Sequence, residues 1–450
     1  MRNKLSSSKI GKVSFVIFFV SLLMIAQKVA SQDFIHYCEK LKRATELIGE
    51  DRTTLEIMRT IDDLLPIHRE KESEAFVRVK NYDCKKAFLI LKQRSSLKLN
   101  TSVNVRCDCC PKEAGSVCCA ALCVHVRQYN DLAPIGSMNW LESIDLSGTS
   151  SVDYYIDNIE IIFRITKLVE LKLRRLKDGN QLLSKLPWEK IPNLKVLELR
   201  DMNLNETEFL TKLPQLRSLD LSYNNLHSIS GLGAQKALNL INVSCNPLDN
   251  LSDLSSSANL ELIIADIRNL NALDFNLPKL KGFSHKPSHC SISSRSLGKE
   301  YAKPLDISSF ANSKKLEFLN IESREIIGVN SLKDLTFLRW VKFKINNKDS
   351  FPIDILPPNV KWLFLKPINL LSPEQIDTAI RRRKICLDFN SICGSSLNFQ
   401  NMIKCLKQNN IKCDKTCIEQ NETNCDDIRD DETKKIKGTE YFNVLKALSY

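Results

Sequence analysis

The stretch Leu216-Arg-Ser-Leu219-Asp-Leu221-Ser-Tyr-Asn224-Asn-Leu226 has the spacing L-x-x-L-x-L-x-x-N-x-L. The alternation of Leu219 and Leu221 predicts a short strand with both side chains on one face. Asn224 follows that strand, where a buried amide can satisfy the backbone groups of a turn. Apolar residues then recur every three positions, which predicts a tight helical turn.

The same spacing recurs along the middle of the chain. Ten units begin at Leu141, Leu168, Leu194, Leu216, Leu238, Leu260, Leu280, Leu316, Leu338 and Val360. Most successive starts are 20–27 residues apart, and 22 is the commonest step. One unit cannot bury its apolar side alone, so neighbouring units must stack.

These units resemble the leucine-rich-repeat family, in particular its short class of 22-residue repeats, over residues 138–370. The resemblance implies an α/β leucine-rich-repeat solenoid. In such a solenoid a curved parallel sheet carries short helical turns on its convex side. Weaker or shifted units, where we expect local departures from this geometry, contain Thr149, Arg268, Arg324 and Asn346.

The longest step between repeats is 36 residues, which leaves about 14 extra residues and predicts a loop at about residues 285–303. His285, His289 and Cys290 in this loop suggest a metal site. However, the proline between the two histidines opposes the helix that would align them. A disulfide between Cys290 and Cys245 is the favoured interpretation.

The N-terminus has the features of a secretory signal peptide. Basic residues at positions 2, 4, 9 and 12 precede an apolar run over residues 13–26. This run is shorter than the roughly 20 apolar residues of a membrane span. Val29-Ala30-Ser31 suits a signal-peptidase site, so we expect a mature, secreted, extracellular chain from about Gln32. An uncleaved signal anchor is the alternative. The sequence contains no second apolar stretch of spanning length, and no transmembrane segment is expected after signal cleavage.

Sixteen cysteines follow the signal segment, as suits an oxidising compartment. They fall into three groups of even number, so we predict that disulfides close within each group. Zinc binding is the alternative for the dense group over residues 107–123, but an extracellular location favours disulfides. The predicted disulfide cysteines are Cys38, Cys84, Cys107, Cys109, Cys110, Cys118, Cys119, Cys123, Cys245, Cys290, Cys386, Cys393, Cys405, Cys413, Cys417 and Cys425.

Five N-x-Ser/Thr sequons support the same compartment and predict a glycoprotein. They lie at Asn100, Asn205, Asn242, Asn250 and Asn421. Asn242 stands between the inward residues Ile241 and Val243, so we expect its side chain to point out of the concave sheet. A glycan there would confine a large protein ligand to the repeats from Phe318 onward.

The regions on either side of the repeats are expected to cap the exposed ends of the solenoid. Apolar residues at three- and four-residue steps predict an α-helical N-terminal segment, and a Cys38–Cys84 bridge is expected to staple it. After the last repeat, Ser372, Pro373 and Gln375 predict the start of a helix. The expected organisation is a signal peptide 1–31, a helical segment 32–98, a cysteine-rich N-terminal cap 99–137, the solenoid 138–370, a cysteine-rich C-terminal cap 371–425 and a charged tail 426–450.

Charge and motifs exclude several function classes. The net charge of +12 falls to about +7 without the five basic residues of the signal segment. This mild balance favours solubility and contact with acidic glycans, and does not indicate a nucleic-acid binder. The sequence has no G-x-S-x-G, H-E-x-x-H or phosphate-binding glycine loop, and its six histidines are scattered. We therefore expect no enzyme, no cofactor and no metal.

Strand positions that point outward form columns across the repeats. One column reads Ser143, Glu170, Val196, Ser218, Leu240, Leu262, Gly282, Phe318, Trp340 and Trp362. Its C-terminal half is apolar and aromatic where the repeat frame predicts exposure, and lysines flank it. An apolar patch rimmed by charge is typical of interaction sites. The predicted ligand-binding residues are Leu240, Leu262, Phe318, Trp340, Lys342, Lys344, Trp362, Phe364 and Lys366.

The favoured function is binding of an extracellular protein or an acidic glycan through the concave face. The alternative is a structural component of an extracellular matrix or coat. The predicted surface has its own alternative, in which the loop after Lys286 or the C-terminal cap folds over the aromatic column. Neither the ligand nor the oligomeric state follows from the repeats, because one fold hosts many functions.

Overall fold

The computed structural model describes residues 34–43, 83–93, 96–98, 129–136, 138–146, 155–267, 277–286, 304–345, 351–366, 371–387, 406 and 416–425. The predicted signal segment, Asn100, the cysteines of residues 107–123, the predicted loop beyond Lys286 and the charged tail lie outside these residues. The chain divides into two compact units, Met1–Met202 and Asn203–Tyr450.

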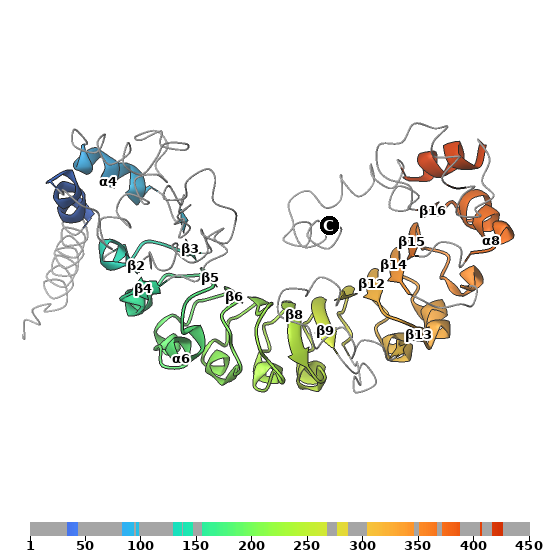
Figure 1. Cartoon of the computed structure of the whole chain (residues 1–450), viewed down its shortest axis with the longest axis horizontal. Helices are drawn as coiled ribbons and strands as arrows, with labels where there is room; N and C mark the ends of the chain where they lie inside the picture. Colours follow the sequence, from blue (N-terminus) through green and yellow to red (C-terminus); the bar gives the residue numbers. More distant parts are fainter. Residues whose placement is uncertain are drawn as a thin grey trace, which may run out of the picture. The chain divides into compact units, whose positions relative to one another are not determined.

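The first unit contains a parallel sheet together with short helical turns (Figure 1). Its order is β1 (Ser96–Lys98), β3 (Ser143–Leu146), β5 (Glu170–Arg174) and β6 (Val196–Arg200). A second, two-stranded parallel sheet pairs β2 (Tyr129–Asp131) with β4 (Tyr155–Asp157). The turns are 3-10 helices at Ala133–Ile135, Ile159–Arg164 and Trp188–Lys190, and α6 (Gly179–Leu183).

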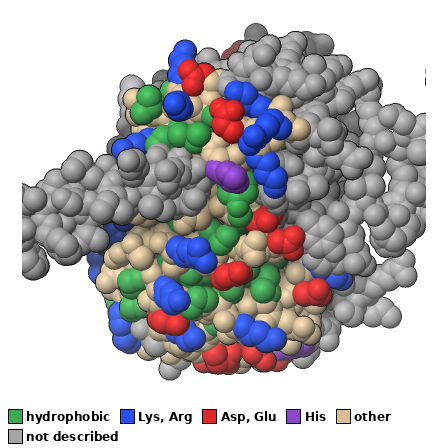
Figure 2. All heavy atoms as spheres, turned by 90° about the vertical axis from the view of Figure 1, so that its left-hand side faces the viewer, with side chains coloured by type: hydrophobic (Ala, Val, Ile, Leu, Met, Phe, Trp, Pro, Cys, Tyr) green, Lys and Arg blue, Asp and Glu red, His purple; other side chains and the backbone are tan. Residues whose placement is uncertain are grey.

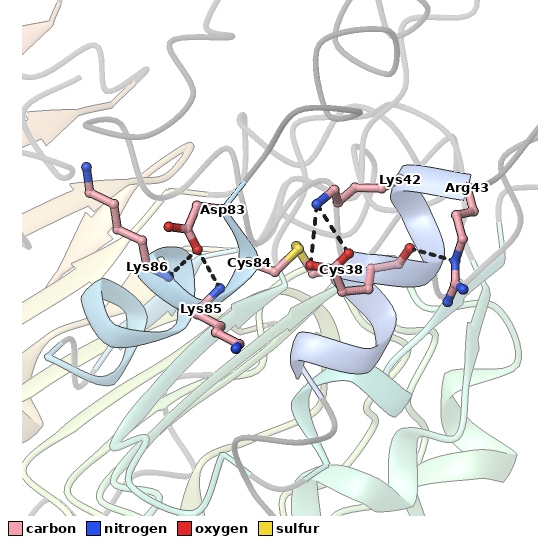
Figure 3. The surroundings of a disulfide bond; sticks show 8 residues. Cys38, Lys42, Arg43, Asp83, Cys84, Lys85 and Lys86 are labelled. Carbon is pink, nitrogen blue, oxygen red and sulfur yellow. Dashed lines mark hydrogen bonds and ion pairs between the residues drawn. A yellow bond between two sulfur atoms is a disulfide. The ribbon is translucent and has the colours of Figure 1, made fainter.

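Two helices precede these repeats and are joined by the predicted Cys38–Cys84 disulfide, which the structure confirms. The first covers residues 34–43 and the second is α4 (Cys84–Lys92). In Figure 3 the Asp83 carboxylate caps α4 by accepting from the backbone N–H groups of residues 85 and 86. Phe88 of α4 packs edge-on against Trp140, with ring centroids 5.8 Å apart, and so attaches the helix to the first repeat.

The end of the predicted helical segment 32–98 is not helical. Residues 96–98 form β1, which pairs in parallel with β3 through Ser96 and Ser143. The sheet therefore begins before the predicted N-terminal cap. Residues 133–135, inside that predicted cap, already form a helical turn of the kind that follows the repeat strands.

The second unit holds the longer parallel ladder. Its order is β7 (Ser218–Asp220), β8 (Leu240–Leu248), β9 (Leu262–Ile267), β10 (Gly282–His285), β12 (Phe318–Glu322), β14 (Trp340–Lys344), β15 (Trp362–Lys366) and β16 (Cys386–Leu387). A separate pair joins β11 (Leu305–Asp306) to β13 (Ile326–Ile327). The 3-10 turns are Glu208–Lys212, Leu232–Ala234, Ser252–Ser256, Ser308–Asn312, Val329–Asp334 and Ile353–Ile355. This alternation of parallel strands and short helical turns confirms the predicted α/β leucine-rich-repeat solenoid.

The core consists of the inward strand residues and the apolar residues of the turns. Leu219 and Leu221 of the quoted stretch are fully buried, as are Ile241 and Val243 one repeat later. The predicted role of Asn224 is confirmed: its Oδ1 accepts from the backbone N–H of residue 204 and its Nδ2 donates to the carbonyl of residue 221. Buried polar side chains of this kind join successive turns without leaving backbone groups unsatisfied.

The C-terminal cap begins as the sequence predicts. The Ser372 hydroxyl accepts from the Gln375 N–H, and the Gln375 side chain accepts from the Ser372 N–H, which makes a capping box. The helix comprises α8 (Pro373–Asp377) and a wider turn at Thr378–Arg382. A second helix at residues 416–425 is tied to β16 by the Cys386–Cys425 disulfide. Among the described residues, no helix has the length and apolarity needed to cross a bilayer.

Candidate ligand-binding face

The strand register of the second unit aligns the outward column that the repeat frame predicts. Direct partners follow one another from Ser218 through Leu240, Leu262, Gly282, Phe318 and Trp340 to Trp362. The ladder then continues to Cys386. We call Leu240, Leu262, Gly282, Phe318, Trp340 and Trp362 the aromatic column. All of its members belong to the second unit.

The column is less exposed than its strand positions predict. Leu262 is 1% exposed and Phe318 is 8% exposed. These two side chains form a buried cluster against which Leu240 and Trp340 pack. Gly282 stands between them in the register and contributes no side chain. Because that position is empty, its two neighbours can lean toward each other, and the expectation of a fully exposed column is corrected on this point.

The C-terminal end of the column is a group of stacked aromatic rings. Trp340 and Trp362 are half-buried, and their ring centroids are 5.3 Å apart at an angle of 35°. Trp362 stacks on Phe364 at 6.1 Å with the two planes 12° apart. Phe364 itself is buried, at 6% exposed. The two tryptophans are therefore the aromatic side chains that remain in part open to a ligand at this end.

Lysines lie beside these rings. The Lys342 ammonium stands 5.0 Å from the centre of the Phe364 ring, a distance at which a cation is attracted to the ring face. Lys344 forms an ion pair with Glu322 on the neighbouring strand. Lys366, the direct register partner of Lys344, is exposed. The charged rim that the sequence predicts is thus assembled on adjacent strands.

Lys286 joins the same group, although it is not among the predicted ligand residues. It follows β10, and burial together with the charges of Lys342 and Lys344 lowers its pKa below the usual lysine value. Glu322 and Asp266 act in the opposite direction. The strand order places Lys286, at the end of β10, two strands from Lys342 and Lys344 of β14 on the same sheet.

His285 is a strand residue, not part of the predicted loop. It occupies an inward position of β10 and is 2% exposed. Its Nδ1 lies 3.2 Å from the carbonyl oxygen of Ala265 and 4.0 Å from a carboxylate oxygen of Asp266. Burial lowers the pKa of His285, so the ring is neutral at neutral pH.

The carboxylate of Asp266 has its own backbone partners. Its Oδ2 accepts from the N–H of Cys245 at 2.8 Å, and its Oδ1 accepts from the N–H of Lys286 at 2.7 Å. These bonds join three consecutive repeats at the point where His285 replaces an inward apolar residue. Within the described ranges, no group of three or more His, Cys, Asp or Glu side chains is placed to hold a metal ion.

Asn242 lies on the outward side of β8, as its place between two inward residues predicts. Its Nδ2 donates to the Asp220 carboxylate at 2.9 Å, and its Oδ1 accepts from the Ser244 hydroxyl at 2.7 Å. The side chain is half-buried. A glycan on Asn242 would leave the amide nitrogen one N–H for the bond to Asp220.

The other described sequons differ in access. Asn205 is exposed and Asn250 is half-buried at the surface of its turn. Asn421 is 4% exposed, and its amide group both donates to the carbonyl of Leu387 and accepts from the Leu387 N–H. An N-glycan needs that amide nitrogen at the surface. The predicted glycan at Asn421 is therefore incompatible with this packing.

Both described disulfide pairs lie inside the groups in which the sequence places them. Cys38 bonds Cys84 and Cys386 bonds Cys425. Cys245 and Cys417 are disulfide-bonded as well. Cys290, the predicted partner of Cys245, lies outside the described residues, so that pairing stays a prediction.

The corresponding strand positions of the first unit are Ser143, Glu170 and Val196, and none of them is aromatic. Glu170 lies 2.6 Å from the Lys172 ammonium and accepts from the Ser143 hydroxyl at 2.6 Å. Arg175 pairs with Asp201. Figure 2 shows basic and acidic side chains interspersed over the described residues on one side of the molecule. Such paired charges offer no counterpart of the aromatic rings in the second unit.

Solved structures similar to this chain have identities below 20% and TM-scores below 0.5. An internalin (inlF) from Listeria monocytogenes is 17% identical at a TM-score of 0.44, over 72% of this chain and 86% of that chain. A second internalin from that organism, C2 (inlC2), is 16% identical at 0.38, over 67% and 100%. The Toll–Spatzle complex of Drosophila gives 15% identity at 0.39, over 52% of this chain and 30% of that chain.

A search of curated proteins finds no significant match. A family model described as leucine-rich repeats (2 copies) matches residues 192–234. The matched repeats and the parallel ladder of strands together show a leucine-rich-repeat fold.

Proposed function

We propose that this chain is a secreted glycoprotein that binds a protein or glycan ligand through the strand face carrying the aromatic column. The observation that supports this most directly is the pair of half-buried tryptophans, Trp340 and Trp362, on the outward side of the sheet. The solenoid requires apolar residues only at its inward positions. Tryptophans on the outward side are therefore better explained by a ligand, since tryptophan is enriched among residues that dominate binding energy.

Secretion rests on the signal-like N-terminus and on the disulfides. Cys38–Cys84 joins the two N-terminal helices and Cys386–Cys425 joins β16 to the last described helix, and an oxidising compartment is needed to keep both bridges closed. Glycans are proposed at Asn100, Asn205, Asn242 and Asn250. The proposed activity is binding without catalysis, as is typical of proteins of this fold.

The test is capture of partners from extracellular fluid with the immobilised full chain. The variant Trp340→Ala/Trp362→Ala should lose partners that the unchanged protein retains. Phe337→Ala is the matched control, because Phe337 is an aromatic residue 56% exposed outside the column. Thermal unfolding of both variants checks that the repeats stay folded.

Three outcomes separate the candidate functions. Loss of partners in the double variant alone supports ligand binding by the column. Identical partner sets in all three proteins contradict it. Concentration-dependent self-association that disappears in the double variant would instead favour the structural alternative, a matrix or coat component.

A further inference from the structure

Two lysines stand directly opposite each other on neighbouring strands at the C-terminal end of the ladder. Lys344 of β14 is the register partner of Lys366 of β15. Like charges in this position destabilise a sheet, because side chains on paired strands are close together. The ion pair between Lys344 and Glu322 offsets one of the two charges. Among the described residues, no comparable ion pair offsets the charge of Lys366, and the fold does not require a charge there.

The local charge balance is positive. Among the described residues, Lys286, Lys342, Lys344 and Lys366 outnumber the acids that act on Lys286, which are Glu322 and Asp266. Asp266 is 1% exposed and accepts from two backbone N–H groups, so it faces the protein interior. His285 adds no charge at neutral pH, because burial lowers its pKa. An anion bound among the four ammonium groups would relieve their mutual repulsion.

We infer that this area binds an anionic glycan that carries sulfate or carboxylate groups along its length. The inference rests on the proposed function and names the ligand class of the same face. Lys286, Lys342, Lys344 and Lys366 supply the positive charge, and Trp340 and Trp362 supply flat apolar surfaces beside it. A sugar ring of such a glycan has an apolar C–H face that can pack on an indole ring. Its anionic substituents can pair with the ammonium groups.

The spacing of the strands fits a sugar chain. Neighbouring strands of a sheet lie about 4.8 Å apart, which is close to the length of one sugar ring. A glycan crossing β14 and β15 would therefore pass, about one sugar unit for each strand, from the strand of Trp340 and Lys342 to the strand of Trp362 and Lys366. An acidic peptide in extended form places its side chains on alternate faces, and only every second carboxylate would face the lysines.

Nucleic acid is a poorer fit for the same residues. The four cations are all lysines, whereas the planar arginine fork is the group that matches phosphate in two-point contacts. The tryptophans also pack against each other at 5.3 Å, with no gap shown between them for an inserted base. The glycan assignment is thus the one that the charges and rings favour.

The experiment measures binding of a heparin-derived octasaccharide to the secreted full chain at about 0.15 M salt. The test variant is Lys286→Gln/Lys342→Gln/Lys366→Gln, which leaves the Lys344–Glu322 ion pair in place. Each lost charged contact is expected to weaken binding about two- to fivefold, so the loss of three contacts should raise the Kd by about tenfold to a hundredfold in total. The matched control, Lys190→Gln/Lys315→Gln/Lys333→Gln, removes the same charge from exposed lysines elsewhere. It should change the Kd by less than about twofold.

Several outcomes would overturn the inference. These are equal binding to both lysine variants, equal binding of a desulfated octasaccharide, or tighter binding of a single-stranded RNA of the same charge. Binding only after removal of residues 426–450 would also overturn it, because the acidic stretch Asp426-Asp427-Ile428-Arg429-Asp430-Asp431-Glu432 would then be the occupant. If the octasaccharide fails but Trp340→Ala/Trp362→Ala still loses its captured partners, the glycan assignment fails and the proposed function stands.

Discussion

Replacement of Asn246 by alanine tests how far the repeats depend on their buried amides. Asn246 is fully buried in the C-terminal half of β8. Its Oδ1 accepts from the backbone N–H of Leu226 at 3.0 Å. Its Nδ2 donates to the carbonyl of Leu221 at 2.9 Å and to that of Val243 at 3.0 Å. One side chain therefore joins its own turn to the preceding repeat.

The expected loss of stability follows from these bonds. Asn246→Ala leaves the Leu226 N–H buried without its acceptor, which costs about 1–3 kcal/mol. The two carbonyls lose a donor as well, and the missing amide leaves a small cavity. We expect the free energy of unfolding of the second unit to fall by about 3 kcal/mol. For a slope of about 3 kcal/mol/M, the urea midpoint falls by about 1 M.

The assay is urea unfolding of the full chain followed by tryptophan fluorescence, since Trp340 and Trp362 report on the same unit. Asn259→Ala is the control, because the Asn259 amide also donates to a backbone carbonyl, that of Lys236 at 2.7 Å, but at an exposed site. That variant should lose less than about 1 kcal/mol. Equal shifts of the midpoint in the two variants would refute the argument that burial makes the asparagine bonds essential.

Three further predictions concern the cap, the glycans and pH. Arg383→Ala removes donors to the carbonyls of residues 353, 356 and 357 at 2.6–2.8 Å. It should lower the melting temperature of the second unit by several degrees, whereas the exposed Arg382→Ala should not. Glycopeptide analysis should find no glycan on Asn421, and full occupancy would contradict its buried amide. Stability should fall as the pH drops below 6.5, because His285 stays neutral when folded but gains a proton when unfolded, and His285→Leu should show a weaker fall.

The spacing of the repeats predicts the strands and their register because both depend on local periodicity. The frame residues lie where inward positions are required, from Leu219 and Leu221 to Val341 and Phe343. His285 is instructive, since the frame that begins at Leu280 itself places it inward. The spacing of His285, His289 and Cys290 led to the prediction of a loop, whereas the repeat frame correctly places His285 in a strand.

Other features of the structure depend on contacts between distant residues, which the spacing of the repeats does not predict. Ser96–Lys98 pairs with Ser143–Leu146 across a long intervening segment, and three residues with one apolar side chain carry no repeat signal. The burial of Phe318 follows from Gly282 on the next strand and from the packing of Leu262. Lys286 joins the other lysines only because β10 and β12 are neighbours in the ladder.

The inward and outward strand positions differ in what they reveal. Inward residues can be exchanged for other apolar residues, because the solenoid requires only that they fill its interior. Outward residues are not set by that demand, and they change from the paired charges Glu170 and Lys172 in the first unit to Trp340 and Lys342 in the second. Lys344 and Lys366 stand directly opposite each other, and their like charges destabilise the sheet. Residues that the fold does not require, and that cost it stability, are best explained by a ligand, so the specificity of this protein is expected to lie on the outward face of its C-terminal repeats.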